Sequence, residues 1–429
     1  MNKELKIGII GLGNVGSGTY DILTQDIEMI NKRSKIPLKL VAVSSRSKKD
    51  FVDETKVKFY SNPLDLVNNA EIDVVVELIG GETTSYELIT GALNNKKHVV
   101  TANKALIASK GTELAHLAAK NNVAFAFESS VAGGIPIIKS IKEGLAANRL
   151  TKIYAILNGT CNYILTKMEE NNADFSEILK EAQALGYAEA DPTFDIEGID
   201  AAHKLSILAS IAKNSKIDFN SLYIEGITKI SIDDINFAKE FGYRIKLLAI
   251  YEDFGNKIKQ AVYPCLIDNN QKIANVNNSY NAVLAFASNV GWNLSAGRGA
   301  GSKPTASAVV ADLIDIANDR SGLPFGVATK DLSDVKTVRI EERIGEYYLR
   351  FFVEKEFAKN SGFIKNIFAN TDLIEKSIIK EIDENSLIYA LKTKSISEVN
   401  INEVISKISE IKEITSLNLI RVEEIASDL

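Results

Sequence analysis

Short apolar runs alternate with helical stretches over the first third of the chain. Helical spacing of apolar residues is seen in 86–93 and 111–120. The strand-length apolar runs are residues 5–10, 38–43, 74–78, 98–101 and 123–128. This βαβα alternation predicts an α/β fold with a Rossmann-type, doubly wound parallel sheet.

The pattern changes near residue 148. Residues 149–157 alternate in strand fashion, and a helix is predicted after residue 162. A second helix is predicted from Ile199, where apolar residues recur at helical spacing. We therefore expect an α+β catalytic domain after the parallel sheet.

The last segment has a third pattern. It predicts strand 347–353, helix 362–370, strands 374–381 and 386–392, helix 399–411 and strand 416–422. This βαββαβ order is the ferredoxin-like arrangement, and we expect a separate module. The expected domains are residues 1–135 completed by 300–320, a catalytic domain over 136–299, a linker over 321–345, and the module over 346–429.

Composition narrows the class of protein. A chain of 429 residues with 45% hydrophobic and 25% charged residues is typical of a soluble protein of two or three domains. The net charge of −6 argues against nucleic acid as a partner, and no apolar run is long enough for a membrane. Two cysteines and three histidines, without metal-ligand spacing, argue against zinc. We expect a cytoplasmic enzyme without a secretory signal.

A glycine-rich turn follows the first predicted strand. Gly11, Gly13 and Gly16, with Asn14 and Val15 between them, form GxGxxG at a strand-to-helix junction. The glycines permit a tight turn and a close approach of pyrophosphate, and the helix N-terminus attracts phosphates. This predicts a dinucleotide site; the alternative is a glycine-rich turn in another kind of α/β protein.

The loop after the second strand bears on the choice of cofactor. NAD enzymes usually place a carboxylate there, but residues 44–49 read SSRSKK. Arg46 could pair with a 2′-phosphate or stack on adenine, so we expect NADP(H) to be preferred over NAD(H). The alternative is a solvated basic loop.

Further ligand contacts are predicted at strand ends. Thr101 and Lys104 follow the fourth strand, at the edge of the sheet where ligands bind. Gly301 lies in a second glycine-rich loop, 297–305, that leads into a helix. This loop is either another phosphate or nicotinamide contact or a flexible turn between domains.

Residues 189–204 concentrate charge. Asp200 and Lys204 lie four residues apart and project from one helix face, as in an ordinary surface ion pair. Glu189 and Asp195 in the same stretch favour a site for a charged substrate. Nearby, residues 159 and 160 could present N–H groups and a hydroxyl to an anionic group.

Together these segments resemble the homoserine dehydrogenase family over essentially the whole chain. The matching motifs are IGIIGLGNVG, VTANKALIA, ESSVAGGIPII, LNGTCNYIL, AEADPTFDIEGIDAAHKL and GRGAGSKPTASAVVADL. The resemblance implies NAD(P)(H)-dependent interconversion of L-aspartate 4-semialdehyde and L-homoserine, on the route to threonine and methionine. It also implies homodimers or homotetramers built through the catalytic domain.

The resemblance implies roles for particular residues. Lys204 would donate a proton or polarise the aldehyde oxygen, assisted by Lys104 and Asp200. The substrate would be bound by Gly159, Thr160, Glu189, Asp195 and Lys204. A sodium ion would be held at Glu128 and by the carbonyls of Val131, Gly133 and Ile135, because oxygen ligands suit a hard cation.

The C-terminal module resembles an ACT domain, which implies an amino-acid effector such as L-threonine. Ser361-Gly362 stands where Pro-Gly is common in that pattern.

Two alternatives remain open at this point. A cysteine-dependent semialdehyde dehydrogenase would use Cys161 as nucleophile and would need inorganic phosphate, although Cys161 is equally compatible with packing. A nucleotide-sensing regulatory protein would not need the charged cluster at 189–204.

Overall fold

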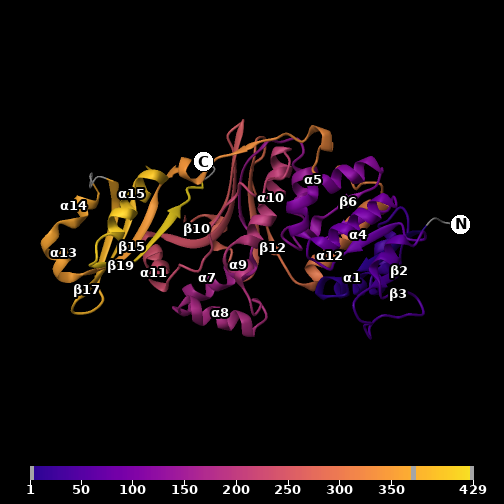
Figure 1. The fold of residues 1–429 in the computed structure, drawn as a ribbon, viewed down its shortest axis with the longest axis horizontal. Coiled ribbons are helices and arrows are strands. Elements are labelled where there is room, and N and C mark those ends of the chain that lie inside the picture. Colours follow the sequence, from indigo (N-terminus) through magenta and orange to yellow (C-terminus); the bar gives the residue numbers. More distant parts are fainter. Residues whose placement is uncertain (1–3, 369–372, 426–429) are drawn as a thin grey trace.

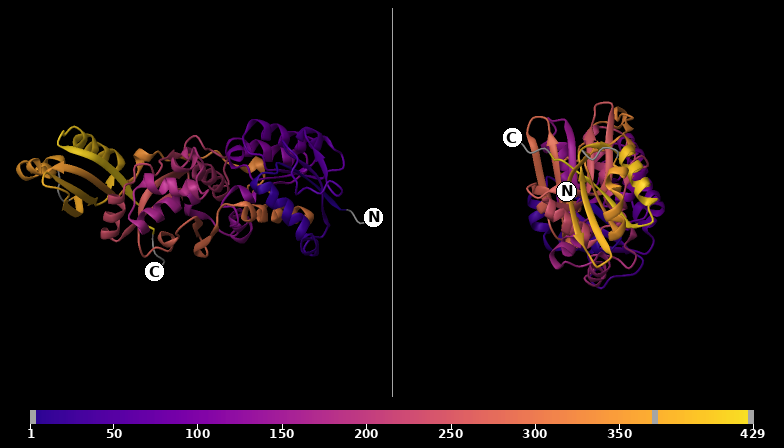
Figure 2. Two further views of the ribbon diagram at one scale, coloured as in Figure 1. Left: turned by 90° about the horizontal axis from the view of Figure 1, so that it is seen from below. Right: turned by 90° about the vertical axis from the view of Figure 1, so that its left-hand side faces the viewer.

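The computed structural model describes residues 4–368 and 373–425. The molecule is elongated, and the N-terminal and C-terminal parts of the chain lie at opposite ends of it (Figure 1). Seen from below, the N-terminal part and the C-terminal segment again lie at opposite ends, with the middle of the chain between them (Figure 2, left). Within the described ranges, no helix is both long and apolar enough to cross a membrane.

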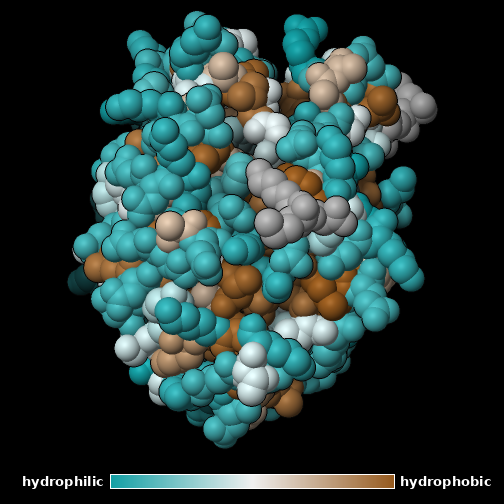
Figure 3. Space-filling model, turned by 90° about the vertical axis from the view of Figure 1, so that its right-hand side faces the viewer, coloured by the Kyte–Doolittle hydropathy of each residue, from teal (hydrophilic) through white to brown (hydrophobic). Residues whose placement is uncertain are grey.

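The N-terminal part confirms the predicted parallel sheet. Its strand order is β3-β2-β1-β4-β5-β6, and every neighbouring pair is parallel. The strands are β1 (Leu5–Ile10), β2 (Leu38–Ser44), β3 (Lys58–Tyr60), β4 (Val74–Glu77), β5 (His98–Thr101) and β6 (Phe125–Ala126). The last strand is shorter than predicted. This end of the molecule presents mainly hydrophilic side chains, with small apolar patches between them (Figure 3).

Helices cover both faces of this sheet because its strands are apolar on both sides. Ile7 and Ile9 pack in one core with α1 and α12, whereas Val75 and Val99 pack in another with α3, α4 and α5. Residues 302–317 therefore pack on the N-terminal sheet, although in the sequence they follow the strands of the middle sheet described below. The helices are α1 (Asn14–Gln25), α2 (Ile27–Lys32), α3 (Pro63–Asn68), α4 (Thr83–Asn94), α5 (Lys104–Lys120) and α12 (Ser302–Ala317).

The middle part is built on an antiparallel sheet with strand order β12-β11-β7-β9-β10. Helices α7, α10 and α11 pack on it. The strands are β7 (Leu150–Ile156), β9 (Tyr243–Asp253), β10 (Lys257–Asp268), β11 (Tyr280–Ala287) and β12 (Gly291–Arg298), with the short β8 (Tyr223–Ile224). The helices are α6 (Ile137–Lys139), α7 (Gly159–Asn171), α8 (Phe175–Ala184), α9 (Thr193–Ile196), α10 (Ile199–Lys213) and α11 (Ile232–Phe241).

The C-terminal segment forms antiparallel strands in the order β19-β15-β17-β16. Its first helix differs from the prediction: it begins at Lys355 and is interrupted at Gly362, where φ is +52°. The end of the predicted helix 362–370 lies outside the described residues. The elements are β15 (Tyr347–Glu354), α13 (Lys355–Ser361), α14 (Phe363–Ile367), β16 (Ile374–Glu381), β17 (Ser386–Thr393), α15 (Glu398–Ser409) and β19 (Ile414–Val422).

This C-terminal segment continues the middle sheet. Strand β19 pairs in parallel with β10, so the two form one sheet of 11 strands. The expected linker is also partly ordered into strands: β13 (Lys336–Thr337) pairs with β10, and β14 (Ile344–Gly345) pairs with β18 (Ile396–Ser397). The C-terminal segment therefore shares a sheet with the middle part, and the expected linker, residues 321–345, contacts that sheet through β13.

A buried polar cluster ties the two parts of this sheet together. Asp234 on α11 is fully buried and accepts hydrogen bonds from Arg350 (2.7 Å) and Asn418 (2.9 Å) of the C-terminal strands. It also accepts a bond from the Ser231 backbone N–H (2.9 Å), so it caps its own helix. Removing one partner would leave a charge buried without compensation.

We predict that Arg350→Met lowers the free energy of unfolding by about 3 kcal/mol or more, because Asp234 would lose its charged partner. Urea unfolding followed by circular dichroism measures the change. As a matched control, Lys35→Met removes a pair with Asp319 whose side chains are 69% and 72% exposed. The free energy of unfolding of Lys35→Met should stay within about 0.5 kcal/mol of that of the unaltered chain. Equal effects of the two variants would contradict the prediction.

Candidate active site

The charged cluster assembles around Asn158, which directly precedes α7. Its side-chain carbonyl accepts the Cys161 N–H (2.8 Å) and thereby caps the helix. Its amide group donates to Asp195 (2.7 Å) and to Asp200 (2.9 Å). The sequence analysis missed this role of Asn158; an asparagine before the first residue of a helix is the signal that could have indicated it.

Lys204 and Asp200 form a buried ion pair at the start of α10. The Lys204 ammonium donates to Asp200 Oδ2 (2.7 Å) and to the Leu157 carbonyl (2.7 Å), and the residue is only 8% exposed. A second cation, Lys104, lies 3.2 Å from Asp200 Oδ1. An ammonium has three donors, so Lys204 retains one for a further acceptor. This arrangement is not an ordinary surface pair.

The two carboxylates that share Asn158 differ in proton affinity. Burial would raise the pKa of Asp200, but the charges of Lys204 and Lys104 outweigh burial and hold that pKa below its usual range. The pKa of Asp195 is raised, mainly by burial and by the neighbouring Asp200 charge. Asp200 therefore stays ionised, and on acidification Asp195 takes up a proton first.

The remaining predicted substrate residues differ in how closely they approach the Asp195 and Asp200 carboxylates. Thr160 is near them, because its hydroxyl lies 3.3 Å from Asp195; the same hydroxyl donates to the Tyr187 carbonyl (2.8 Å). Gly159 begins α7, where an added Cβ would lie 2.9 Å from the Ser279 carbonyl oxygen. Glu189 is exposed, and only its backbone carbonyl receives a hydrogen bond from a described residue, Gln183.

Lys104 reaches this cluster from the parallel sheet. It is the first residue of α5, whose cap is Asn103. The Thr101 hydroxyl donates to buried Glu77 (2.7 Å) and accepts the Asn103 N–H (3.0 Å), so it holds the β5–α5 turn in place. Through these two bonds the Thr101 side chain helps to position Lys104.

The glycine-rich turn, residues 11–16, has open space beside Gly13, where the motif needs room for a ligand. Gly11 has φ +97°, and a Cβ on Gly16 would lie 1.8 Å from the Gly11 carbonyl oxygen, so neither position tolerates a side chain. A Cβ on Gly13 would meet nothing within 4 Å. Gly13 caps α1 without a side chain, so the N–H groups of Asn14 and Val15 begin an uncapped helix. The turn therefore fits a pyrophosphate.

A second helix N-terminus lies beside this turn. Gly301, with φ +109°, precedes α12, and the Ser302 hydroxyl donates to the Asn14 carbonyl. The loop 297–305 is thereby adjacent to the first glycine-rich turn, as a second phosphate or nicotinamide contact would have to be.

The basic loop after β2 contains an unengaged arginine. Arg46 is exposed and makes no hydrogen bond or ion pair with the described part of the chain. Lys48, in contrast, is neutralised by both carboxylate oxygens of Glu54, each at 2.9 Å. Arg46 is thus available to a negatively charged group.

The loop after β6 has the oxygen donors that a hard cation needs. Ala132 and Gly133 are both left-handed, and the carbonyls of buried Val131 and Gly133 accept no hydrogen bond from the described residues. Ile135 differs, because its carbonyl accepts the Ile137 N–H (2.7 Å). Unpaired buried carbonyls favour a monovalent cation at this turn.

Glu128 lies at the start of this loop, and its backbone carbonyl accepts the Val131 N–H (3.4 Å). Its carboxylate already accepts the N–H groups of Ile138 (2.9 Å) and Lys139 (2.8 Å). Burial and the nearby Asp312 raise its pKa to about 7. Within the described ranges, no three His, Cys, Asp or Glu side chains converge as a metal site would require.

Cys161 is not placed as a nucleophile. It is fully buried, and its thiol donates to the Asp195 carbonyl (3.1 Å). Burial raises the pKa of the thiol well above its usual value, with Asp195 and Asp200 adding to the effect. The thiolate that a cysteine-dependent mechanism needs is therefore disfavoured.

Comparisons with known proteins agree on one family. The chain matches the family models "Homoserine dehydrogenase, NAD binding domain" over residues 11–128 and "Homoserine dehydrogenase" over residues 136–314. It is 42% identical to a homoserine dehydrogenase of Pseudomonas aeruginosa, over 99% of this chain and 100% of that one. A relative from Helicobacter pylori is 41% identical over 97% of each chain.

Solved structures give the same result. A homoserine dehydrogenase from Thiobacillus denitrificans has a TM-score of 0.90 at 41% identity, over 98% of this chain and 99% of that chain. A hyperthermophilic archaeal homoserine dehydrogenase in complex with NADPH has a TM-score of 0.64 at 26% identity, over 75% of this chain and 100% of that chain.

We predict that neither cysteine of the folded chain reacts rapidly with iodoacetamide, because Cys161 and Cys265 are both buried with raised thiol pKa values. Mass spectrometry before and after unfolding in urea measures the modification. Both thiols should react only in the unfolded chain, which serves as the control. Rapid modification of Cys161 in the folded chain would contradict this assignment.

Proposed function

The chain belongs to the homoserine dehydrogenase family, an NAD(P)-dependent oxidoreductase acting on the CH–OH group of homoserine, and we propose that Lys204 handles the proton of this reaction. The reaction interconverts L-homoserine and L-aspartate 4-semialdehyde. The observation that carries the proposal is the buried Lys204–Asp200 pair, in which the ammonium has one donor left over. The cysteine-dependent alternative has no support from the buried Cys161 or from the comparisons.

The nicotinamide cofactor, when bound, supplies the hydride chemistry. As the aldehyde is reduced, negative charge grows on its oxygen, and the remaining N–H of Lys204 stabilises that charge and delivers a proton. Asp200 keeps Lys204 oriented, and Lys104 adds a second positive charge beside the same carboxylate. Donors that act on a developing oxyanion contribute roughly 3–4 kcal/mol.

The amino-acid end of the substrate carries an ammonium and a carboxylate, and each needs groups of the opposite polarity in the protein. We assign its ammonium to Asp195 and Glu189, and its carboxylate to the N-terminus of α7 at Gly159 and Thr160. Asn158 supports this assignment of the substrate's two charged groups, because its amide donates to both Asp195 and Asp200 and so fixes them relative to each other. Glu189 is exposed, and its carboxylate makes no hydrogen bond or ion pair with a described residue, so it would be available to the ammonium of bound substrate.

For the cofactor we propose NADP(H) in preference to NAD(H). Gly11, Gly13, Gly16 and Gly301 would form the phosphate-binding turns, and Arg46 would meet the 2′-phosphate. The absence of a carboxylate in residues 44–49 supports this choice. A structural relative is described in complex with NADPH.

Three further features belong to the same proposal. A sodium ion would be held at Glu128 and by the backbone carbonyls of Val131, Gly133 and Ile135. The protein would form homodimers or homotetramers through the middle sheet. The C-terminal segment would be an ACT-like module with L-threonine as effector, supported by its strand order β19-β15-β17-β16.

We predict that Lys204→Met lowers kcat by about 10²–10³-fold, because one oxyanion donor is lost, and leaves the Kd of NADPH unchanged. Nicotinamide absorbance with L-homoserine and NADP⁺ measures the rate, and the unaltered chain must be active in this assay. The control Lys167→Met removes a pair with Glu170 on α7 and should leave kcat unchanged. A Lys204 variant with near-normal kcat would exclude Lys204 from the proton chemistry.

We predict that Arg46→Ala raises KM for NADPH and leaves KM for NADH nearly unchanged, because only NADPH carries the phosphate that arginine would pair with. Lys48→Ala is the matched control in the same loop: its charge is already neutralised by Glu54, so both KM values should stay as they are. Equal losses for both cofactors in Arg46→Ala would mean that Arg46 stacks on adenine.

A further inference from the structure

Three aromatic side chains pack one against the next beside Lys104. The Lys104 ammonium lies over the ring of Phe194, 5.6 Å from its centroid. His203 packs against Phe194 with the ring centroids 5.4 Å apart, and Phe219 stacks on His203 at 4.4 Å. The assignments made so far give these three rings no role, although they adjoin a cation of the candidate active site.

Lys104 needs a second partner to fix its ammonium. Nζ lies 3.2 Å from Asp200 Oδ1, but it makes no hydrogen bond with the described part of the chain, and the side chain is 33% exposed. Asp200 is instead hydrogen-bonded by Lys204 (2.7 Å) and Asn158 (2.9 Å). A lysine side chain is long and flexible, so holding it in one place costs conformational entropy. The Asp200 charge by itself therefore leaves the Lys104 ammonium poorly fixed.

The Phe194 ring can supply that second contact. The face of a phenyl ring carries partial negative charge and attracts an ammonium within about 6 Å of the ring centroid. Phe194 belongs to the short helix α9, and the next residue, Asp195, receives the Asn158 amide at 2.7 Å. The backbone that carries the ring is thereby anchored to the charged cluster. The Phe194 ring is thus held in a defined position relative to Asp200.

His203 gives the Phe194 ring an uncharged neighbour. Its Nδ1 is sealed from solvent and has no hydrogen-bond partner among the described residues. Burial lowers the pKa of His203, because a charged imidazolium is poorly stabilised away from water. A neutral imidazole does not compete with the Lys104 ammonium for the electrons of the Phe194 ring. His203 therefore supports the ring by packing and leaves its attraction for the cation intact.

We propose that Phe194 is a positioning residue for this reaction, whose ring holds the Lys104 ammonium beside Asp200 through a cation–π contact. The proposal rests on the role proposed above for Lys104, which adds positive charge where the aldehyde oxygen becomes negative. His203 and Phe219 in turn keep the ring in place. Phe194 acts through Lys104 and makes no contact of its own with the reacting atoms.

The test replaces Phe194 in the full chain by phenylalanines whose rings carry one, two or three fluorine atoms. Fluorine withdraws electrons from the face of the ring and changes its shape little, so the cation–π contact weakens in steps. The rate constant kcat should fall with each fluorine and lie about two- to fivefold below that of the unaltered chain for the trifluoro ring. The same series at Phe286, which packs on Trp292 at 5.1 Å, is the control and should leave kcat unchanged. An unchanged kcat throughout the Phe194 series overturns the proposal.

Lys104→Met shows whether the ring acts through the ammonium. In this background fluorination of Phe194 should leave kcat unchanged, because the cation that the ring would hold is gone. Lys110→Met is the matched control: it removes from the same helix α5 an ammonium 5.9 Å from the Tyr86 ring, and the fall in kcat with fluorination should persist. If that fall also persists in Lys104→Met, or if fluorination raises KM for L-homoserine in both backgrounds, the ring acts on something other than Lys104 and the proposal is overturned.

The Lys104→Met variant also separates this proposal from the proposed function. By itself it should lower kcat about tenfold or more, because positive charge beside the developing oxyanion is lost. If kcat falls in this way and the Phe194 series stays flat, only the positioning by Phe194 is overturned. If Lys104→Met leaves kcat unchanged, the role proposed for Lys104 fails, and the positioning by Phe194 fails with it.

Discussion

The site depends on the burial of one charge pair, Lys204 with Asp200. Removing such a pair from water is costly, and the cost is offset only when the remaining donors and acceptors are satisfied. Here Asn158, Lys104 and the Leu157 carbonyl satisfy them. Leu157 and Asn158 are consecutive residues between β7 and α7, whereas Lys104 begins α5. The start of α10, the end of β7 and the start of α5 are therefore held together by the same set of contacts.

This constraint explains why the site lies between the two sheets. The parallel sheet contributes the glycine-rich turn and, through the Thr101–Glu77 bond, the position of Lys104. The middle sheet contributes α10 and the capped start of α7. The salt bridge from Lys104 to Asp200 joins these two contributions at 3.2 Å. A cofactor held at the first sheet is thereby brought near the Lys204 ammonium held by the second.

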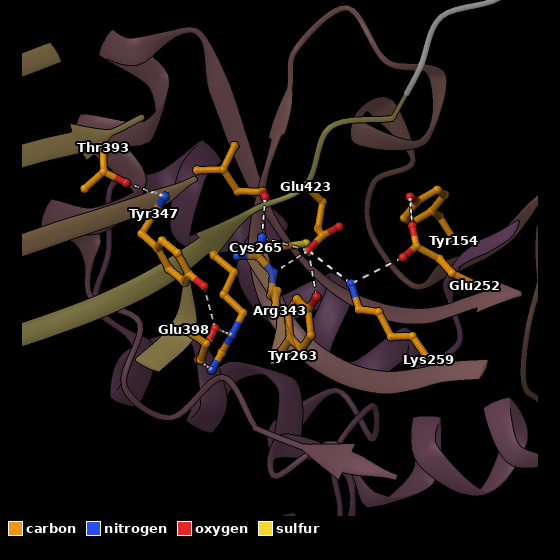
Figure 4. Close-up of polar contacts among 12 residues, drawn as sticks. Tyr154, Glu252, Lys259, Tyr263, Cys265, Arg343, Tyr347, Thr393, Glu398 and Glu423 are labelled. Carbon is orange, nitrogen blue, oxygen red and sulfur yellow. Dashed lines mark hydrogen bonds and ion pairs between the residues drawn. The ribbon is translucent and has the colours of Figure 1, made fainter. Parts of the chain in front are cut away.

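Strand β10 connects the catalytic part with the C-terminal segment. On one side it pairs with β19, and Lys259 and Ala261 line a cavity of about 450 Å³ that is bounded by β10, the segment 338–346 and the end of β19 (Figure 4). The next residue, Val262, packs close to Gly198, where an added Cβ would lie 3.2 Å from its side chain. Gly198 has φ +82° and caps α10, the helix that carries Asp200 and Lys204. One strand thus separates this cavity from α10.

The sequence by itself determined the parallel sheet and its nucleotide turn, because buried strands and close backbone approaches leave a mark in residue type: apolar runs, and glycines at positions 11 and 16. It also placed Asp200 and Lys204 on one helix face, since their spacing is a property of the helix alone. Tertiary structure decided which other groups join them. Asn158 enters the cluster, Glu189 stays exposed, and the Thr101 hydroxyl turns to Glu77. The pairing of β19 with β10 was likewise decided only in the folded chain, because hydrogen bonds between distant backbones depend on where the strands meet and not on the side chains they carry.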